Sequence, residues 1–175
     1  MAFIDRMKGQ DYIDATRKYL NYVEEHLENV RLAFDELSRA CDGMWWVGDD
    51  MSWHHMRHDV EHHDLSKFSR HEFTQYRAFF YPVDDKDKAE SGFEAAWEHH
   101  KRCNHHHHET VSNYADMVHM IIDWTAMSYK FGGTAQEYYE KKAINDVKFD
   151  GELIGEMYVI FEKLKAYREK KLYEH

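Results

Sequence analysis

A stripe of apolar residues in the first part of the chain forms its most regular pattern. Its members follow one another at alternating steps of three and four residues: Leu20, Val23, Leu27, Val30, Phe34, Leu37 and Cys41. Since an α-helix turns once in about 3.6 residues, this spacing places all of them on one face. The stripe predicts a long first helix that ends at Asp42 and Gly43, with His26 at the shoulder of its buried face.

The same periodicity recurs in further segments, which are separated by short polar stretches. Helices are expected at Met51 to about Lys67 and at 70–81, 93–109, 111–131 and 152–172. The charged stretch 82–90 is expected to be an exposed linker, because Pro82 ends the helix before it. The pattern predicts an all-α fold, a single-domain bundle of about six or seven helices that spans residues 1–175.

Three serine or threonine residues give signals for the starts of helices. Ser69, Ser91 and Thr134 each stand three residues before a glutamate, which is the capping-box pattern. They predict the starts of the third helix, of the fourth helix and of a short additional helix. Gly132 and Gly133 should end the helix at 111–131, because glycine readily adopts the left-handed conformation that follows a helix C-terminus.

Composition narrows the class of protein. Eight glycines and one proline leave few places to break a helix, in agreement with an all-α fold. The net charge of −10, with histidines neutral, argues against binding to duplex nucleic acid or to a membrane surface. No apolar run is long enough to cross a bilayer, and Cys41 and Cys103 are expected to be reduced thiols. These features predict a cytoplasmic protein.

Histidine is the unusual component, with 15 residues concentrated in the middle of the chain. Catalytic metal sites use imidazole nitrogen and carboxylate oxygen, and the ligands converge from several elements. Four predicted helices offer such groups, which are His26, the adjacent pair His63 and Asp64, a run of histidines, and Asp123. The sequence therefore suggests a metal site that is built from distant parts of the chain.

Asp123 lies in the apolar stretch MVHMIIDWTAM. Burying a carboxylate in such a stretch is unfavourable unless a cation or strong donors compensate it. A buried pair with an arginine or a tyrosine is the alternative explanation. Asp116, seven residues earlier on the same helical face, is expected to orient a ligand histidine.

The run AWEHHKRCNHHHHE supplies further candidates on the predicted fourth helix. His100 and His107 are seven residues apart and share a face, and His106 lies next to that face. The members expected to point outward are His99, His105 and His108. A surface tract of histidines without a specific site is the alternative for the whole run.

The chain contains two adjacent His-Asp pairs. His58 and Asp59 form the earlier pair, but only the later pair, His63 and Asp64, is followed by a lysine one turn on, at Lys67. Because the two pairs face different directions on one helix, the later pair is chosen as the inward-facing one. The remaining histidines are expected to be solvated or hydrogen-bonded bystanders: His54, His55, His62, His71 and His119.

The order His26, then His63 and Asp64, then Asp123 resembles the H…HD…D pattern of the HD-domain superfamily of metal-dependent phosphohydrolases. The stretch HDLSK looks like the HD-x-G-K element of its cyclic-dinucleotide phosphodiesterase branch, although Ser66 stands here in the place of glycine. The chain is also similar to a family of small phage and bacterial proteins that carries a domain-of-unknown-function label. That likeness rests on HDLSKFS, AWEHHKRCNHHHHE and DMVHMIIDWTAM.

The resemblance implies an HD-like fold and a metal-dependent phosphohydrolase that uses one or two divalent ions, with Mn, Fe, Ni, Zn or Mg as candidates. The ions would activate a water molecule, and Lys67 would contact a phosphoryl oxygen. The implied ligands are His26, His63, Asp64 and Asp123 around a first ion, and His100, His106 and His107 around a second, with Asp64 able to bridge the two.

The expected substrate is a small-molecule phosphate ester, with a nucleotide preferred. The tryptophans Trp45, Trp46 and Trp53 are candidates to stack on its base. Two other functions stay open, a di-iron oxygenase on the same scaffold and a non-enzymatic, metal-stabilised protein that mediates a phage–host interaction. The sequence also leaves open which metal binds and whether the chain forms oligomers.

Overall fold

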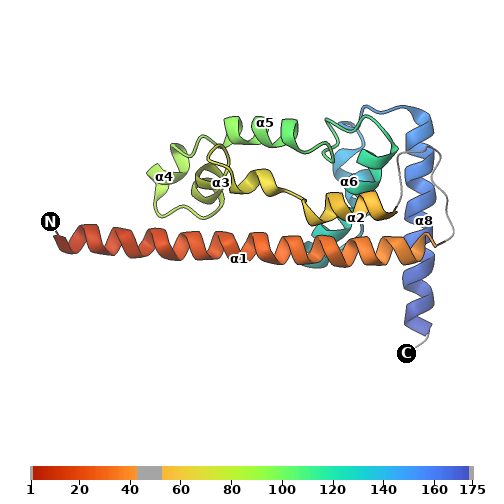
Figure 1. The fold of residues 1–175 in the computed structure, drawn as a ribbon, viewed down its shortest axis with the longest axis horizontal. Coiled ribbons are helices and arrows are strands. Elements are labelled where there is room, and N and C mark those ends of the chain that lie inside the picture. The colour runs from red at the N-terminus through yellow and green to blue at the C-terminus, as the bar shows by residue number, and fades with distance from the viewer. Residues whose placement is uncertain (1, 43–52, 174–175) are drawn as a thin grey trace. The chain divides into compact units, whose positions relative to one another are not determined.

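The computed structural model describes residues 2–42 and 53–173, and Figure 1 shows its fold with most of the helices labelled. Every regular element in these ranges is helical, which confirms the all-α fold class. The α-helices are α1 (Ala2–Ala40), α2 (Trp53–Glu61), α3 (Phe73–Phe80), α4 (Asp85–Ala89), α5 (Phe93–Cys103), α6 (Tyr114–Phe131), α7 (Ala135–Tyr138) and α8 (Gly151–Tyr173). A 3₁₀-helix, η1 (Leu65–Phe68), and a π-helix, η2 (Tyr139–Ala143), complete the set. Within these ranges, no helix combines the length and apolar character needed to span a membrane.

The chain folds as two compact units, each assembled from segments that are distant in the sequence. The first unit contains Met1–His26 and Asp64–Asn104, and the second contains Leu27–His63 and His105–His175. The first unit therefore holds the start of α1 with η1, α3, α4 and α5, and the second unit holds the other helices. The single-domain organisation and the likeness to an HD domain stay predictions.

The second unit is built around an apolar core. Its helix α6 contacts α2, α7 and α8. The core buries Val30 and Leu37 of α1, Met56 of α2, Ile121 of α6 and Ile160 of α8. Full burial of such a side chain contributes about 1.5–3 kcal/mol of hydrophobic stabilisation. The packing explains why the apolar periodicity identified α6 and α8 so clearly.

The predicted apolar stripe of α1 is confirmed in its second half and shifted in its first. Phe34 and Leu37 are buried, whereas Leu20 is 39% exposed and its neighbour Tyr19 is buried. Alternating steps of three and four residues average 3.5, but the helix turns once in about 3.6 residues. Five turns back from Leu37 therefore lead to Tyr19. His26, expected at the shoulder of the stripe, is buried.

The first unit has a strongly polar interior. Its helix α3 contacts α4, α5 and η1. The buried apolar residues of this unit are Ala15, Tyr19, Val23, Tyr76, Ala78 and Ala96. Its buried polar or charged residues are His26, Asp64, Lys67, Glu72, Arg77 and His100. Because burying charged groups is unfavourable unless they are paired or bind a cation, this interior is a candidate functional site.

The second predicted helix is shorter than expected. It ends at Glu61, and a turn followed by η1 replaces the expected continuation to Lys67. Asp64 has a φ of 57°, the left-handed conformation, which aspartate tolerates better than most residues but which cannot continue an α-helix. The expectation that one α-helix continues through His63 and Asp64 to about Lys67 was therefore wrong.

Two of the three predicted capping boxes were wrong, and the third is confirmed. Thr134 accepts a hydrogen bond from the backbone of Glu137, and the Glu137 side chain bonds back to the Thr134 amide. In contrast, α3 begins after Glu72 and α5 begins after Gly92, and neither start has a side-chain cap. Gly92 has a φ of 69°, so its backbone conformation sets the start of α5 in place of Ser91.

Two further boundaries differ from the sequence prediction. The stretch expected to be a linker contains α4, and Arg77 of α3 pairs through both guanidinium nitrogens with the carboxylate of Asp87 in α4. The fourth predicted helix ends at Cys103, and Asn104 after it is extended. His105–His108 therefore lie outside this helix, and the shared helical face expected for His100 and His107 was wrong.

Candidate metal centres

Asp64 lies at the centre of a buried cluster in the first unit. Its Oδ2 accepts a hydrogen bond from Lys67 Nζ at 2.5 Å and lies 3.5 Å from His26 Nε2. Its Oδ1 lies 3.2 Å from His100 Nε2. The exposed fractions of these four residues range from 1% for His100 to 9% for Lys67. One carboxylate thus faces two imidazole nitrogens and one ammonium group away from bulk water.

The local backbone explains how Asp64 and Lys67 meet. Lys67 follows Asp64 by three residues, and its amide donates to the Asp64 carbonyl oxygen at 2.9 Å. In a 3₁₀-helix, side chains three residues apart lie directly above one another. The left-handed turn at Asp64 and the tight winding of η1 therefore hold the ammonium over the carboxylate, which a regular α-helix would do less closely.

Glu72 fixes the orientation of His100 from the side opposite Asp64. Its Oε2 lies 2.8 Å from His100 Nδ1 and accepts from Ser66 Oγ at 2.9 Å. Its Oε1 lies 2.6 Å from His99 Nδ1. When His100 carries its proton on Nδ1 and donates it to Glu72, its Nε2 lone pair faces Asp64. A carboxylate that holds a histidine in this way is the usual partner of a metal-binding imidazole.

The charges of the cluster stabilise one another. Burial acts to raise the pKa of Glu72, but hydrogen bonds from His100 and His99 outweigh it and lower the pKa. Burial acts to lower the pKa of His100, but Asp64 and Glu72 outweigh it and raise the pKa. The two carboxylates therefore favour a positive charge at His100, which compensates theirs. A divalent cation at His100 Nε2 would take over this compensation.

The donor set of this cluster fits a transition metal. Neutral imidazole nitrogen and carboxylate oxygen are the ligands of zinc, iron, nickel and manganese sites. His26 of α1 and His100 of α5 each present a ring nitrogen to one oxygen of Asp64, which lies in the turn before η1. Ligands that converge from three separate segments, supported by an orienting carboxylate, are typical of a built site and not of a surface tract.

A second cluster, made mainly of histidines, lies in the second unit. His63, His106 and His119 each offer one ring nitrogen, and these atoms lie within 4.8 Å of one another. His63 Nδ1 is 2.9 Å from His119 Nε2, so one of these nitrogens donates a hydrogen bond and the other accepts it. His63 Nε2 lies 3.6 Å from Asp123 Oδ1, and the His107 ring packs against His106 at 4.5 Å between centroids.

The structure thus gathers the predicted site residues in two groups. The first unit holds His26, Asp64, Lys67 and His100, and the second unit holds His63, His106, His107 and Asp123. The two ion sites expected from the sequence combine residues of both units, and that grouping stays a prediction. Asp116 is not involved in either group, because it accepts hydrogen bonds from Ser112 and Asn113 at the start of α6.

Sequence reasoning missed three contributors to these clusters. Glu72 was interpreted as part of a capping box, His99 as an outward-facing member of the run, and His119 as a bystander. The signal for His119 was present, because it stands four residues before Asp123 and therefore on the same side of α6. Glu72 offered no comparable signal, since its partners come from other segments.

His99 connects the first cluster with the surface. It is partly exposed and stacks on the ring of His71 at 4.9 Å, and Cys103 Sγ lies 3.8 Å from its ring nitrogens. Both cysteines are free, Cys103 at the surface and Cys41 in the interior, in agreement with the expected reduced thiols. Because Glu72 joins His99 to His100, any change of charge at His99 acts on the inner cluster.

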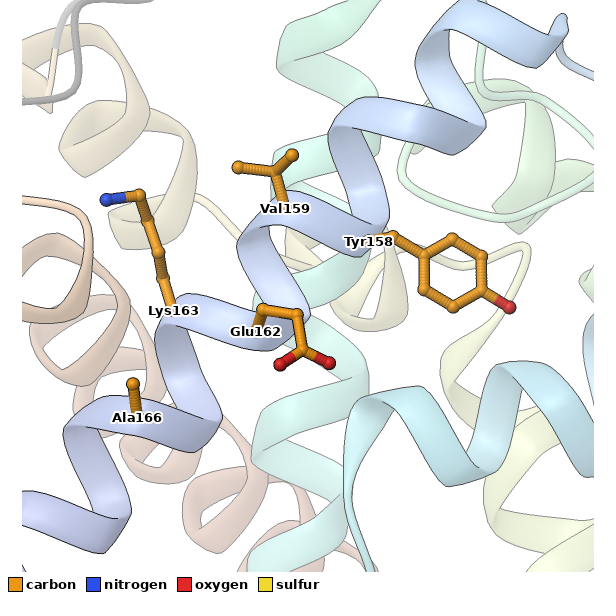
Figure 2. Close-up of a pocket in the computed structure, with 5 residues that line it drawn as sticks. All are labelled: Tyr158, Val159, Glu162, Lys163 and Ala166. Atoms are coloured by element: carbon orange, nitrogen blue, oxygen red, sulfur yellow. The ribbon is translucent and has the colours of Figure 1, made fainter.

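A shallow surface hollow on α8 is unrelated to either cluster. It is lined by Tyr158, Val159, Glu162, Lys163 and Ala166, which all belong to this one helix, as Figure 2 shows. Tyr158 and Lys163 point to opposite sides of the helix in that view. Among the tryptophans considered for base stacking, Trp53 packs edge-to-face on Phe34 at 5.8 Å, and Trp45 and Trp46 lie outside the described residues.

Comparison with known proteins gives a family and no activity. No curated protein and no solved structure matches the chain. One family model matches residues 15–162, a range that includes every member of both clusters. The chain therefore belongs to the family described as "Family of unknown function (DUF5662)".

Proposed function

We propose that the protein is a metal-dependent phosphohydrolase of the HD type that acts on a small phosphate ester, with a nucleotide as the preferred class. The observation that carries the proposal is the position of Asp64 between His26 Nε2 and His100 Nε2, with Lys67 on the same carboxylate. Two neutral imidazoles and a carboxylate suit a divalent ion, and a lysine beside them suits a phosphate.

The residues of the first unit would have different roles in the reaction. His26, Asp64 and His100 would hold the ion, and Glu72 would keep the His100 ring in the metal-binding tautomer. A divalent ion bound there supplies Lewis acidity, which polarises phosphoryl oxygens and lowers the pKa of water. Asp64 would also accept a proton from an attacking water molecule, because one carboxylate oxygen can act as a base while the other binds the ion.

Lys67 would bind the substrate. Its ammonium bonds to Asp64 Oδ2, and as a compact positive charge it would contact a non-bridging phosphoryl oxygen. Lys67 is 9% exposed and pairs with Asp64. The net charge of the chain does not oppose an anionic substrate, since the charges within a buried site dominate the local field.

The second cluster supports a second ion. His63, His106 and His119 offer three nitrogens, with Asp123 beside His63, and these groups match the same class of metals. The proposal therefore includes one or two ions. The cytoplasmic location and any self-association stay predictions.

Burial of the first cluster favours one alternative function. Asp64 and His100 are 2% and 1% exposed. Such buried ligands are expected when the metal only stabilises the fold, and the protein would then act by interacting with other macromolecules. A di-iron oxygenase on the same scaffold is distinguished by turnover that depends on dioxygen. Both alternatives retain the metal. The oxygenase would catalyse a different reaction, and the structural protein would catalyse none.

The test compares two matched substitutions. Asp64→Asn removes the central carboxylate. Asp59→Asn makes the same change in the exposed pair with His58, where the Asp59 side chain is 53% exposed. Purified variants loaded with Mn²⁺, Ni²⁺, Fe²⁺ or Zn²⁺ are screened against nucleotides, cyclic nucleotides and simple phosphate esters. Asp64→Asn should abolish turnover and remove the ion of the first unit, which lowers the metal content, and Asp59→Asn should preserve both. Turnover that survives Asp64→Asn would reject the proposal, and metal binding without any turnover would select the structural alternative.

A further inference from the structure

Two buried tyrosine hydroxyls in the first unit lack hydrogen-bond partners. Tyr19 is 1% exposed and Tyr76 is 6% exposed, and neither Oη has a partner among the residues that the structure describes. Buried hydroxyl groups in native proteins nearly always bond to protein, to water or to a ligand. Two such groups in one small unit therefore indicate a polar partner that the described residues do not supply.

Both tyrosines adjoin the Asp64 cluster. The Tyr19 ring packs edge-to-face on Phe73, the residue after Glu72, with the ring centroids 5.4 Å apart. The ring centroid of Tyr76 lies 5.8 Å from Lys67 Nζ and 5.7 Å from the His100 ring. Burial raises the pKa of Tyr19, the positive charge of Lys67 opposes the rise, and Asp64 and Glu72 add to it. Burial also raises the pKa of Tyr76, with contributions from Glu72, Asp64 and Tyr19. Each tyrosine is thus close enough to the charged cluster to interact with it.

A tyrosine hydroxyl is protonated at neutral pH, so each of these two hydroxyls can donate a hydrogen bond. The acidic side chains nearby already accept from other groups, Asp64 from Lys67 and Glu72 from His100 and Ser66. A ligand that accepts hydrogen bonds, and above all an anion, suits two protonated hydroxyls beside an ammonium group.

We propose that Tyr19 Oη, Tyr76 Oη and Lys67 Nζ form a subsite for the terminal phosphoryl group of a phosphate monoester. A monoester has three non-bridging oxygens, which match three donors, whereas a diester has two. The inference rests on the proposed function, since it names the substrate class of the same site. The tyrosines bind the phosphoryl group and leave metal binding to His26, Asp64 and His100.

Phosphate binding by tyrosine variants tests this subsite. Tyr19→Phe and Tyr76→Phe, alone and together, remove one oxygen each, and Tyr12→Phe on the exposed part of α1 in the same unit is the control. The melting temperature is measured with and without inorganic phosphate, and the dissociation constant for phosphate is measured by calorimetry. The metal content of every variant is determined in parallel.

The wild type and Tyr12→Phe should be stabilised by phosphate, and the double variant should bind it at least about tenfold more weakly, since two charge-assisted hydrogen bonds are lost. Without phosphate, the double variant should melt at the wild-type temperature or above it, because the removed hydroxyls had no protein partner. Unchanged phosphate affinity would overturn the inference. So would a lower melting temperature of the double variant without phosphate, which would show that the hydroxyls bond within the fold. Neither result requires turnover, so failure of the subsite is distinguishable from failure of the Asp64 test.

Discussion

Substitution of Glu72 by glutamine tests how the first cluster is organised. Glu72 is fully buried, and its two oxygens serve three donors, His99 on Oε1 and both His100 and Ser66 on Oε2. Glutamine has nearly the same shape but replaces one acceptor oxygen with an NH₂ donor. If that NH₂ faces His100, the imidazole must move its proton to Nε2, the atom that would bind the metal.

The expected loss of metal affinity depends on which way the glutamine side chain is oriented. With the NH₂ group toward His99, His100 keeps a neutral acceptor and loses only the charge of its partner. With the NH₂ group toward His100, the metal-binding tautomer is lost. Removal of such an orienting partner weakens metal binding about 10- to 100-fold in known sites, which corresponds to about 1.4–2.8 kcal/mol.

The assay is an equilibrium competition for Zn²⁺ between the protein and a chromophoric chelator. Glu98→Gln on α5 is the control, because the Glu98 side chain is 63% exposed and pairs with Lys101 on the same helix. Circular dichroism shows whether each variant retains its helices. Glu98→Gln should leave the affinity unchanged.

A double-mutant cycle identifies the route of the effect. In a His100→Ala background there is no imidazole for Glu72 to orient, so Glu72→Gln should then change the affinity less than twofold. An equal loss of Zn²⁺ affinity in both backgrounds would contradict an effect through His100 and would assign Glu72 a general structural function. Wild-type affinity in Glu72→Gln itself would refute it as well.

Two other measurements test the stability of each unit. In the second unit, burial acts to raise the pKa of Glu36, but hydrogen bonds from Arg168 and Tyr129 outweigh it and lower the pKa. Glu36 therefore stabilises the fold above its unfolded pKa of about 4.3, and this contribution of about 2 kcal/mol is lost as pH falls through the lower folded pKa. Urea denaturation of Glu36→Gln should show a loss of stability at pH 7 that disappears in acid, and an equal loss at both pH values would contradict it. In the first unit, EDTA should lower the melting temperature of the metal-loaded wild type by more than that of Asp64→Asn, since only the wild type loses the cation bound at Asp64; equal shifts would contradict a site at Asp64.

The sequence predicted best what depends on local pattern. The apolar periodicity of α6 and α8, the capping box at Thr134 and the stop at Gly132 were all correct, because each rests on residues within a few positions of one another. Even the α1 stripe failed only where a 3.5-residue repeat drifts away from the helical turn, at Leu20.

The details of the site depended on contacts between distant segments and were harder to predict. The choice of the pair His63 and Asp64 over His58 and Asp59 agrees with their burial. The left-handed turn at Asp64 was not predictable, because the apolar pattern continues through it. Glu72 was also missed, since its partners His99 and His100 lie 27 and 28 residues further along the chain.

Anomalous scattering from crystals grown with Mn²⁺ or Zn²⁺ tests the central claim most directly, because it reports the position and the element of each ion together. The account predicts a peak bound by the Asp64 carboxylate and by Nε2 of His26 and His100, at about 2.0–2.2 Å from each. Strong peaks only at exposed histidines such as His54 and His58, with none at Asp64, would contradict it.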